Sequence, residues 1–368
     1  MPFGFRFVAV SDVPVWHKFA IFAAFSADEN RVVRIGRKKN AVYRMKDNII
    51  GRFAPSPSGR MHLGNVYSAL LSWLSAKSQG GQWILRIEDL DPQRCKREYA
   101  VQLEDDLRWL GLDWDAGGID HPDYVQSLRG DVYSECLARL TSAGYTYPCY
   151  CSRADILATQ APHESDGRVV YRGTCRPDGT PEKEAWLSHR AASCPHPPAT
   201  RLRVPDREIS FVDGHYGIQS VNLAQSCGDF ILRRADGAWA YQLAVVVDDA
   251  MMGVTEVVRG RDLLLSVPQQ LYLYELLGFR PPKFAHLPLL CNAEGQRLCK
   301  RDRSLHLGIL RQQYSPQEII GQIAFLAHLI DRPEPLSARE LLPHFRWESV
   351  PLDDIVLDAT LVNNSPDC

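Results

Sequence analysis

The chain has 368 residues, of which 45% are apolar and 23% are charged, as is usual for a globular protein of two or three structural units. Its formal net charge of −2 gives no overall basic character, so any RNA contact must come from local patches. No apolar run approaches the roughly 20 residues of a membrane span, and ten unevenly spaced cysteines do not resemble a secreted disulfide framework. These features predict a cytoplasmic protein with no membrane partner.

Residues 1–48 form an extension that differs from the rest of the chain. The apolar run 19–25 is too short to span a membrane, and the basic run 31–44 follows it, whereas a secretory signal carries its basic residues first. A transit peptide would be richer in serine. We expect either that Met45 is the true start or that this segment is a loosely ordered extension.

The region that follows alternates predicted strands and helices. A strand over 48–53 leads to a helix that begins near Gly64 and ends at Gly80-Gly81, with apolar residues at helical spacing. A second strand over 83–87 precedes an amphipathic helix over 100–110, which Gly111 ends. This order predicts a parallel sheet, and ligands bind beyond the carboxyl ends of the strands in such sheets.

The composition changes at residues 145–228, which are rich in Cys, Pro, His and Arg and poor in helical periodicity. We interpret them as an insertion in the sheet domain. The strand pattern returns at 229–234 and again at 240–247, where Asp248 and Asp249 would end a strand. Residues 295–301 are turn-rich and expected to be mobile. These limits divide the chain into 1–48, 49–144, 145–228, 229–304 and 305–368, the last a short helical tail whose final ten residues should be disordered.

Two short motifs have the residues that ATP chemistry needs. The first, His62-Leu63-Gly64-Asn65, follows a Pro/Gly-rich loop at a predicted helix start, and the second is Arg297-Leu298-Cys299-Lys300-Arg301. Gly64 allows a nucleotide to approach the backbone, and the free N–H groups of a helix start favour phosphate. His62 can donate hydrogen bonds to phosphate oxygens, and Lys300 can meet the charge that builds as pyrophosphate leaves. Taken alone, Gly64 could simply start a helix and His62 could be an ordinary loop histidine.

The context strengthens the interpretation as an ATP site. With Arg86-Ile87-Glu88-Asp89-Leu90-Asp91, the two motifs resemble the signatures of class I aminoacyl-tRNA synthetases of the glutamyl and glutaminyl branch. The resemblance runs from about Ile49 to Leu307. Within that branch the chain is similar to the glutamyl-Q tRNA(Asp) synthetases, short paralogues that attach glutamate to a queuosine base. It implies an α/β fold, with a Rossmann-like parallel sheet, helices on both faces, a zinc-binding insertion and a small helical C-terminal tail.

The resemblance also implies a glutamate pocket. Arg52 can bind the side-chain carboxylate in a bidentate way, and Glu88 suits the α-ammonium group. Without the motif, Glu88 and Asp89 would be interpreted as a solvated or helix-capping pair. Asp248 and Asp249 are weaker candidates near the ATP site, since such carboxylates often only cap helices. The glutamate contacts implied by the resemblance are Arg52, Phe53, Ala54, Pro55, Ser56, Glu88, Tyr241 and Arg259; those for ATP are His62, Gly64, Asn65 and Lys300, with His62 and Lys300 catalytic.

Two positions depart from the usual class I pattern. Asn65 replaces the second histidine of the first motif, so it can donate a hydrogen bond but carries no positive charge. In the second motif, Arg297 stands where lysine is common and keeps a cation. Cys299 stands where serine is common and loses a hydroxyl, which puts a hydrogen bond of the loop in doubt but not Lys300.

The cysteine cluster Cys149-Tyr150-Cys151, with Cys175 further on, predicts one structural zinc ion per chain. Zinc takes about four ligands and thiolates suit it, so three cysteines leave one position open. The resemblance fills that position with Tyr171, whose ionised form a bound cation would favour. The alternatives are three buried cysteines without metal, or a histidine ligand from His163, His189 or His196.

The predicted reaction joins L-glutamate to RNA in two steps. ATP with Mg²⁺ activates glutamate as an adenylate, and a hydroxyl of queuosine in tRNA(Asp) then takes the glutamyl group. The stretch 302–368 is too short for the helical anticodon-binding region of ordinary glutamyl-tRNA synthetases. The alternatives are a truncated synthetase that charges a tRNA 3′ end, and a non-catalytic RNA- or amino-acid-binding relic. We expect a monomer.

Overall fold

The computed structural model describes residues 48–152, 155, 170–298 and 305–357. The predicted extension over 1–48 therefore lies outside the described residues except for Asn48, and so do Cys299, Lys300, Arg301 and the last ten residues. No helix in the described ranges combines the length and the apolar character that crossing a membrane requires.

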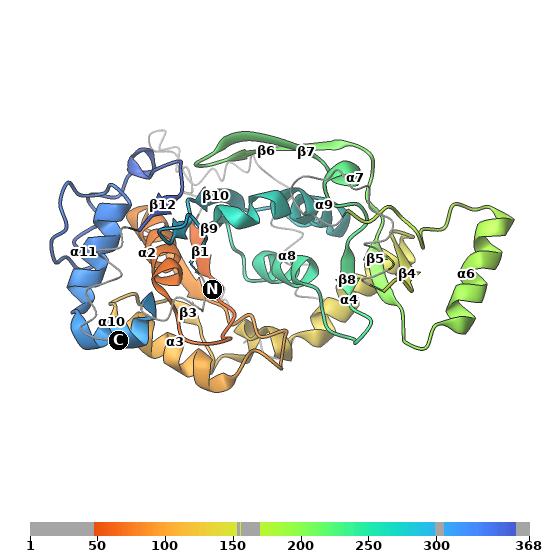
Figure 1. The fold of residues 1–368 in the computed structure, drawn as a ribbon, viewed down its shortest axis with the longest axis horizontal. Helices are drawn as coiled ribbons and strands as arrows, with labels where there is room; N and C mark the ends of the chain where they lie inside the picture. Colours follow the sequence, from red (N-terminus) through yellow and green to blue (C-terminus); the bar gives the residue numbers. More distant parts are fainter. Residues whose placement is uncertain (1–47, 153–154, 156–169, 299–304, 358–368) are drawn as a thin grey trace, which may run out of the picture. The chain divides into compact units, whose positions relative to one another are not determined.

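Helices and strands alternate through most of the described chain (Figure 1). The helices are α2 (Leu63–Ser78), α3 (Arg97–Trp109), α4 (Gly130–Ser142), α6 (Pro181–Ser193), α7 (Leu223–Ser226), α8 (Tyr241–Met251), α9 (Val267–Leu277), α10 (Leu307–Gln313) and α11 (Pro316–Leu326), with short 3-10 turns such as η4 (Arg261–Ser266). The strands are β1 (Ile50–Phe53), β2 (Gln82–Leu85), β3 (Ala116–Gly117), β4 (Thr146–Cys149), β5 (Ala199–Leu202), β6 (Glu208–Asp213), β7 (Gly217–Asn222), β8 (Ile231–Arg233), β9 (Glu256–Gly260), β10 (Lys283–Leu287), β11 (Leu290–Cys291) and β12 (Ile355–Val356).

The central strands are parallel, as predicted. β1 pairs with β2 and β2 with β3, while β9, β10 and β6 form a second parallel set that the hairpin partner β7 extends. A hydrogen bond of 2.9 Å from the Thr255 N–H to the Ile50 carbonyl links the two sets at β1 and β9. The carboxyl ends of β1, β2, β9 and β10 therefore face the same edge, where parallel sheets bind ligands.

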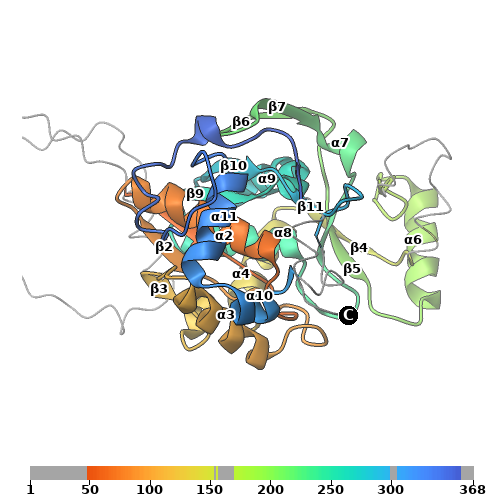
Figure 2. The ribbon, with the colours of Figure 1, turned by 60° about the vertical axis from the view of Figure 1, so that its left-hand side comes forward.

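Alternate residues of these strands belong to two separate hydrophobic cores. Trp83 and Val258 pack in the first core with α2, α3, α10 and α11, whereas their neighbours Ile84 and Val257 pack in the second with α4, α8 and α9. Because successive strand residues point to opposite faces, helices cover both faces of the sheet. Figure 2 shows α10 and α11 beside α2 and α3.

The prediction of a strand over 240–247 is wrong, because this segment is helix α8. Its sequence is a continuous apolar run, and periodicity alone does not separate a buried strand from a buried helix. Leu243 to Val247 are all buried in the second core, so the helix has apolar contacts on most of its circumference. Asp248 and Asp249 consequently lie in the last turns of a helix and do not end a strand.

The segment 145–228 also holds structure that composition did not predict. α6 is a helix of 13 residues with Thr180 as its N-cap, and none of its residues is buried. The predicted strand at 229–234 forms as β8, but it pairs antiparallel with β5 in the sheet β4–β5–β8, not with the parallel sheet. Within the same segment, β6 pairs with β10 of the parallel sheet.

The C-terminal region contains the expected helices. α10 and α11 follow each other closely, and Ser315 with Glu318 forms a capping box at the start of α11. A strand that the sequence did not predict, β12, pairs in parallel with β11 in a separate two-stranded sheet, and Leu357 after it is buried in the first core. This part of the chain therefore packs on the sheet domain.

Candidate functional site: a cleft at the carboxyl ends of β1, β2 and β9

The two motif segments after β1 and β2 lie side by side because the pairing of the strands continues beyond them. The Arg86 N–H donates to the Phe53 carbonyl at 3.0 Å, and the Glu88 N–H donates to the Pro55 carbonyl at 3.0 Å. The Pro/Gly-rich loop is thus held against the Arg86–Asp91 segment. Arg52 and Glu88, far apart in the sequence, reach the same cavity.

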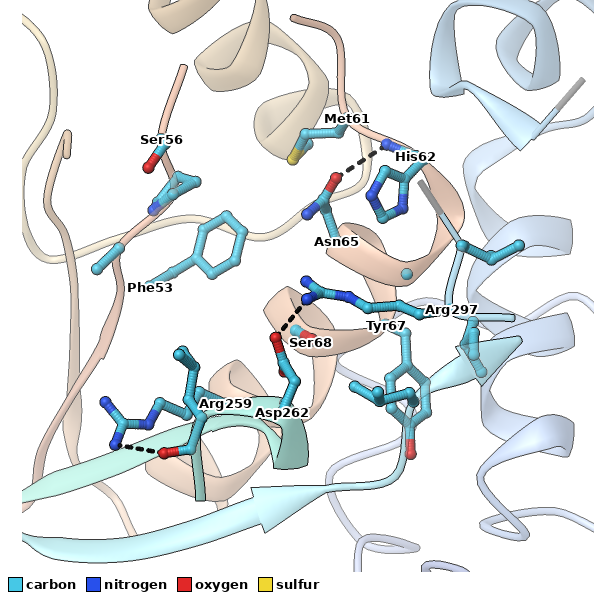
Figure 3. A pocket seen from close by; sticks show the side chains of 18 of the residues that line it. Phe53, Ser56, Met61, His62, Asn65, Tyr67, Ser68, Arg259, Asp262 and Arg297 are labelled. Carbon is cyan, nitrogen blue, oxygen red and sulfur yellow. Dashed lines mark hydrogen bonds and ion pairs between the residues drawn. The ribbon is translucent and has the colours of Figure 1, made fainter. Parts of the chain in front are cut away.

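Helix α2 begins at the first ATP motif, as predicted. His62 is its N-cap, and the His62 N–H donates to the side-chain oxygen of Asn65 at 3.1 Å (Figure 3). A Cβ atom on Gly64 would lie 3.1 Å from the His62 ring, so the glycine keeps this turn open. Asn65 therefore caps the helix through its oxygen and keeps its NH₂ donors, which gives the departure from histidine a structural role.

Residues from both motifs come together at this point. The ideal Cβ position of Gly64 is 4.0 Å from the Leu298 side chain, and the Leu307 N–H donates to the Met61 carbonyl at 2.8 Å. Leu298 and Leu307 lie before and after the residues 299–304, which the structure does not describe. The role predicted for Lys300 thus concerns a residue outside the described ranges.

A cavity of about 460 Å³ opens at these strand ends. Its lining includes every residue that was predicted to bind glutamate or ATP and that the structure describes, together with residues that sequence reasoning did not single out (Figure 3). The predicted residues in its lining are Arg52, Phe53, Ala54, Pro55, Ser56, His62, Gly64, Asn65, Glu88, Tyr241 and Arg259. The helix N-terminus and the arginines make the cavity suitable for anionic groups.

One side of the cavity rests on a buried ionic network. Arg86, fully buried, donates to Asp249 at 2.6 Å and to Glu88 at 3.0 Å, and Arg52 lies 3.4 Å from Asp249. Burial alone would raise the pKa of Asp249, but the charges of Arg86 and Arg52 outweigh it and lower that pKa. For Glu88 burial prevails over the same arginines, so its pKa is raised. Asp249 thus supports Arg52 from behind the cavity.

The neighbouring Asp248 has a different position. Its carboxylate accepts hydrogen bonds from Gln126 at 2.8 Å, Tyr133 at 2.8 Å and Arg129 at 2.7 Å. These contacts tie α8 to α4 and to the turns before it. Neither Asp248 nor Asp249 is among the residues that line the cavity.

Arg259 lies on the opposite side of the cavity, at the end of β9. Its Nε donates to His286 Nε2 at 3.1 Å, and its terminal nitrogens donate to Tyr241 Oη at 3.3 Å, the Leu263 carbonyl at 3.3 Å and Gln270 Oε1 at 2.9 Å. These bonds use four of its five N–H donors. None of the described carboxylates forms an ion pair with Arg259, although the side chain is only 5% exposed.

His286 and Asp213, behind Arg259, were not predicted. His286 Nδ1 lies 2.6 Å from Asp213 Oδ2, and both side chains are buried. The only signal in the sequence is a histidine inside the apolar run 284–290, which is usually a core residue with a satisfied ring. Pairing across the sheet, which the sequence does not reveal, brings these residues to Arg259.

Arg297 lies at the mouth of the cavity, where it forms an ion pair with Asp262 of η4 (Figure 3). Both residues line the cavity. The cation expected at this position is therefore present, and its partner Asp262 is a further residue that the sequence reasoning missed.

The three predicted cysteines converge in the segment 145–228. The sulfur atoms of Cys149, Cys151 and Cys175 lie within 4.8 Å of one another. Tyr171 Oη lies 3.4 Å from Cys149 Sγ and 3.8 Å from Cys151 Sγ and accepts the Cys175 backbone N–H at 2.7 Å, so it lies beside all three cysteines. Three thiols and a phenol at these spacings fit a tetrahedral zinc site. Burial raises the pKa of Tyr171, so only a bound cation would make it a phenolate.

The histidines named as alternative ligands do not join this group among the described residues. His196 Nε2 contacts Cys194 Sγ instead, and His163 lies outside the described ranges. A buried cation does join it: Arg201 donates to Cys149 Sγ at 3.2 Å and stacks on the Tyr171 ring at 3.7 Å. Its positive charge offsets the negative charge of thiolates at this site.

The sequence of the chain matches the model of a known enzyme family. A model of the family "tRNA synthetases class I (E and Q), catalytic domain" matches residues 48–331. The chain belongs to this family. The predicted resemblance and the α/β class I synthetase fold are thereby confirmed, as is the prediction of a ligase-type enzyme.

Individual relatives show which members of the family the chain resembles. The chain is 47% identical to a Glutamyl-Q tRNA(Asp) synthetase of Symbiobacterium thermophilum, across 85% of this chain and 97% of that protein, and 45% identical to one of Nitratidesulfovibrio vulgaris, across 86% and 97%. Among solved structures, a glutamate tRNA ligase of Elizabethkingia meningosepticum in complex with its amino acid superposes with a TM-score of 0.71 at 30% identity. That match covers 86% of this chain and 68% of the ligase.

Proposed function

We propose that this chain activates L-glutamate with ATP in the absence of tRNA and transfers the glutamyl group to the queuosine base of tRNA(Asp). The observation that carries the proposal is the similarity to proteins named Glutamyl-Q tRNA(Asp) synthetase over 97% of their length. The cavity supports the proposal, because its lining includes arginines that can bind a carboxylate and a helix N-terminus that can bind phosphates.

The two sides of the cavity suit the two ends of glutamate. Arg52 and Arg259 present guanidinium groups that can bind carboxylate, and the Tyr241 hydroxyl lies beside Arg259. Glu88 is the acceptor for the α-ammonium group. Because burial raises the pKa of Glu88, an arriving ammonium supplies the counter-charge that favours its ionised form.

The start of α2 and the second motif receive ATP in this proposal. His62, Gly64 and Asn65 lie at the N-terminus of α2, and Lys300 follows Leu298 of the lining. Mg²⁺ bound to ATP supplies charge neutralisation on the phosphates. An oxygen of the glutamate α-carboxylate attacks the α-phosphorus, and the bond to pyrophosphate breaks. A queuosine hydroxyl then attacks the adenylate carbonyl, loses its proton and releases AMP.

The cysteine group is assigned a structural role. We propose one zinc ion held by Cys149, Cys151, Tyr171 and Cys175, which keeps the insertion rigid where it faces the RNA. All cysteines in the described ranges are free thiols. We propose that the chain acts in the cytoplasm as a monomer.

ATP–pyrophosphate exchange with L-glutamate tests the proposal. Exchange without tRNA, followed by transfer of labelled glutamate to queuosine-bearing tRNA(Asp) and not to the same tRNA without queuosine, is the expected result. If exchange is absent under every condition, the assignment of the cavity is wrong, and the chain is a non-catalytic relic.

A second candidate function is charging of a tRNA 3′ end, favoured by the structural similarity to glutamate tRNA ligases. Exchange that requires tRNA(Glu), with transfer to its terminal ribose, would establish this function and exclude transfer to the base. Periodate treatment of the tRNA does not separate the two acceptors, because it oxidises the vicinal diol of the terminal ribose and that of queuosine alike. Nuclease mapping of the labelled nucleotide is therefore the deciding measurement.

A further inference from the structure

We propose that Asp213 and His286 form a positioning relay that holds the Arg259 guanidinium in the orientation that receives the substrate carboxylate. The inference rests on the proposed function, since it takes L-glutamate as the ligand of Arg259. It adds two residues that do not touch the substrate and act through Arg259. Neither residue lines the cavity, and both are buried.

The register of the sheet creates the relay. His286 of β10 is the direct partner of Arg259 of β9, and Asp213 ends the next strand, β6, where it pairs with Phe284. Three adjacent parallel strands thus contribute an acid, an imidazole and a guanidinium, which hydrogen bonds connect in that order. This chain of hydrogen bonds ends at the cavity, because Arg259 is the member that lines it.

The hydrogen bonds specify one form of the imidazole. Asp213 Oδ1 accepts the backbone N–H groups of His215, Tyr216 and His286 at 3.0, 2.9 and 3.2 Å, which leaves Oδ2 to face His286 Nδ1 at 2.6 Å. The carboxylate therefore requires a proton on Nδ1. Nε2 is left as a lone pair, and this lone pair accepts the Arg259 Nε–H at 3.1 Å.

Charge supports the same assignment. All four hydrogen-bond acceptors around Arg259 are neutral when His286 is neutral, so the guanidinium keeps its full charge for an anion in the cavity. A protonated imidazole would lose the acceptor and place a second cation 3.1 Å from the first. Burial lowers the pKa of His286 in spite of the Asp213 carboxylate, which keeps the ring neutral.

A purely structural role for the pair would depend only on packing, whereas the relay depends on one proton. The variant Asp213→Asn separates these roles. The amide oxygen can keep the three backbone N–H groups, so the NH₂ must face Nδ1 and force the proton onto Nε2. Nε2–H would then oppose the Arg259 Nε–H, although size and packing are almost unchanged.

The test measures the tautomer and substrate binding in the same protein. Nitrogen-15 NMR of histidine-labelled full-length chain gives the protonated ring atom of His286, assigned by loss of its signals in His286→Leu. Calorimetric titration gives affinities for L-glutamate and for ATP. Asp115→Asn is the matched control, because Asp115 also accepts a backbone N–H and a side-chain donor but lies away from the cavity.

The relay predicts Nδ1–H in the native chain and Nε2–H in Asp213→Asn. It also predicts a loss of L-glutamate affinity of roughly tenfold to a hundredfold, as for a lost hydrogen bond to a charged group, with ATP affinity unchanged. An inverted tautomer with unchanged glutamate affinity would overturn it, and so would Nε2–H in the native chain. If Asp213→Asn does not fold, the native spectrum and the glutamate affinity of His286→Leu decide.

The proposed function can fail separately. A native chain that does not bind L-glutamate refutes that function and, with it, the ligand assigned to the relay. If His286→Leu and Asp213→Asn bind L-glutamate as tightly as the native chain does, the proposed function stands and the relay alone is refuted.

Discussion

Two buried arginines of the cavity differ in how their charge is balanced. Arg52 has a carboxylate behind it, since Asp249 lies 3.4 Å from its Nε, whereas Arg259 is surrounded by neutral acceptors. A buried cation without a carboxylate partner is costly until an anion arrives. Arg259 is therefore the side chain with most to gain from a bound carboxylate. Arg52 gains less, because Asp249 already offsets part of its charge.

Replacement of Arg52 tests the glutamate pocket directly. Arg52→Ala removes a guanidinium at the cavity and leaves Asp249 with one arginine fewer, so L-glutamate should bind roughly tenfold to a hundredfold more weakly. ATP affinity should change little. Steady-state exchange at varied glutamate and varied ATP measures both, with the exposed Arg97→Ala as control. Unchanged glutamate kinetics in Arg52→Ala would disprove the assignment of Arg52.

Asn65 stabilises the start of α2 through one hydrogen bond, which its side-chain oxygen accepts from the His62 N–H. Asn65→Ala removes the acceptor for the His62 N–H and leaves a donor at the helix start without this partner. We expect the free energy of unfolding to fall by roughly 0.5–2 kcal/mol. Urea unfolding measures it. Asn65→Asp keeps the acceptor oxygen and should retain the stability, so equal losses in both variants would argue against capping.

At the scale of elements, the sequence predicted those segments whose pattern is local. α2 and α3 were found from apolar spacing and from the glycines that follow them, and β1 and β2 from short apolar runs before motif loops. α8 was mistaken for a strand because three consecutive valines are common in strands, and only packing between the sheet and α4 and α9 makes this run a helix. β8 was found, but its partner β5 was not.

In the cavity, too, residues in local sequence patterns were predicted and residues placed by long-range contacts were not. Its predicted residues follow β1 and β2 or belong to motifs, so their positions could be read from short segments. Asp249, Asp213 and His286 support these residues from behind, and they do so through contacts between residues separated by 27 to 197 positions. Register across β6, β10 and β9 determines the contacts of Asp213 and His286, and the position of α8 beside Arg52 and Arg86 determines those of Asp249. A single sequence contains neither.

The segment that carries the cysteines permits a prediction about metal. Arg201 contacts Cys149 Sγ and the Tyr171 ring, so Arg201→Met, of similar length but neutral, should weaken zinc binding by about tenfold. Competition with a chromophoric chelator measures the affinity. Cys149→Ser should reduce the zinc content of the purified chain, and unchanged content would rule out this site. Arg190→Met, which replaces a partly exposed arginine, is the control for loss of charge in the same segment.

The parallel strands of the described unit have a hydrophobic core on each face, and the buried charges that support the cavity lie at their carboxyl edge. Asp249 on α8 and Asp213 on β6 both have lowered pKa values, because their arginine and histidine partners outweigh burial. For such acids the unfolded chain binds protons first as the pH falls. Their contribution to stability is complete above the ordinary carboxyl pKa and is lost as the pH drops through the lowered folded value. Glu88, whose pKa is raised, acts in the opposite sense.

His286 extends this dependence on pH toward neutrality. Its ring contacts Asp213 and Arg259, and burial, together with the charges of Arg259 and Arg52, lowers its pKa below the ordinary value of about 6.5. The unfolded chain therefore takes up a proton at that position before the folded chain does, so the free energy of unfolding should start to fall as the pH drops below about 6.5. In His286→Gln this first decrease should be smaller, whereas the exposed His196→Gln should retain it. Urea unfolding at pH 7.5, 6.5 and 5.5 measures the difference. Identical slopes in the native chain and His286→Gln would mean that His286 is protonated in the folded state, which the Arg259 contact does not allow.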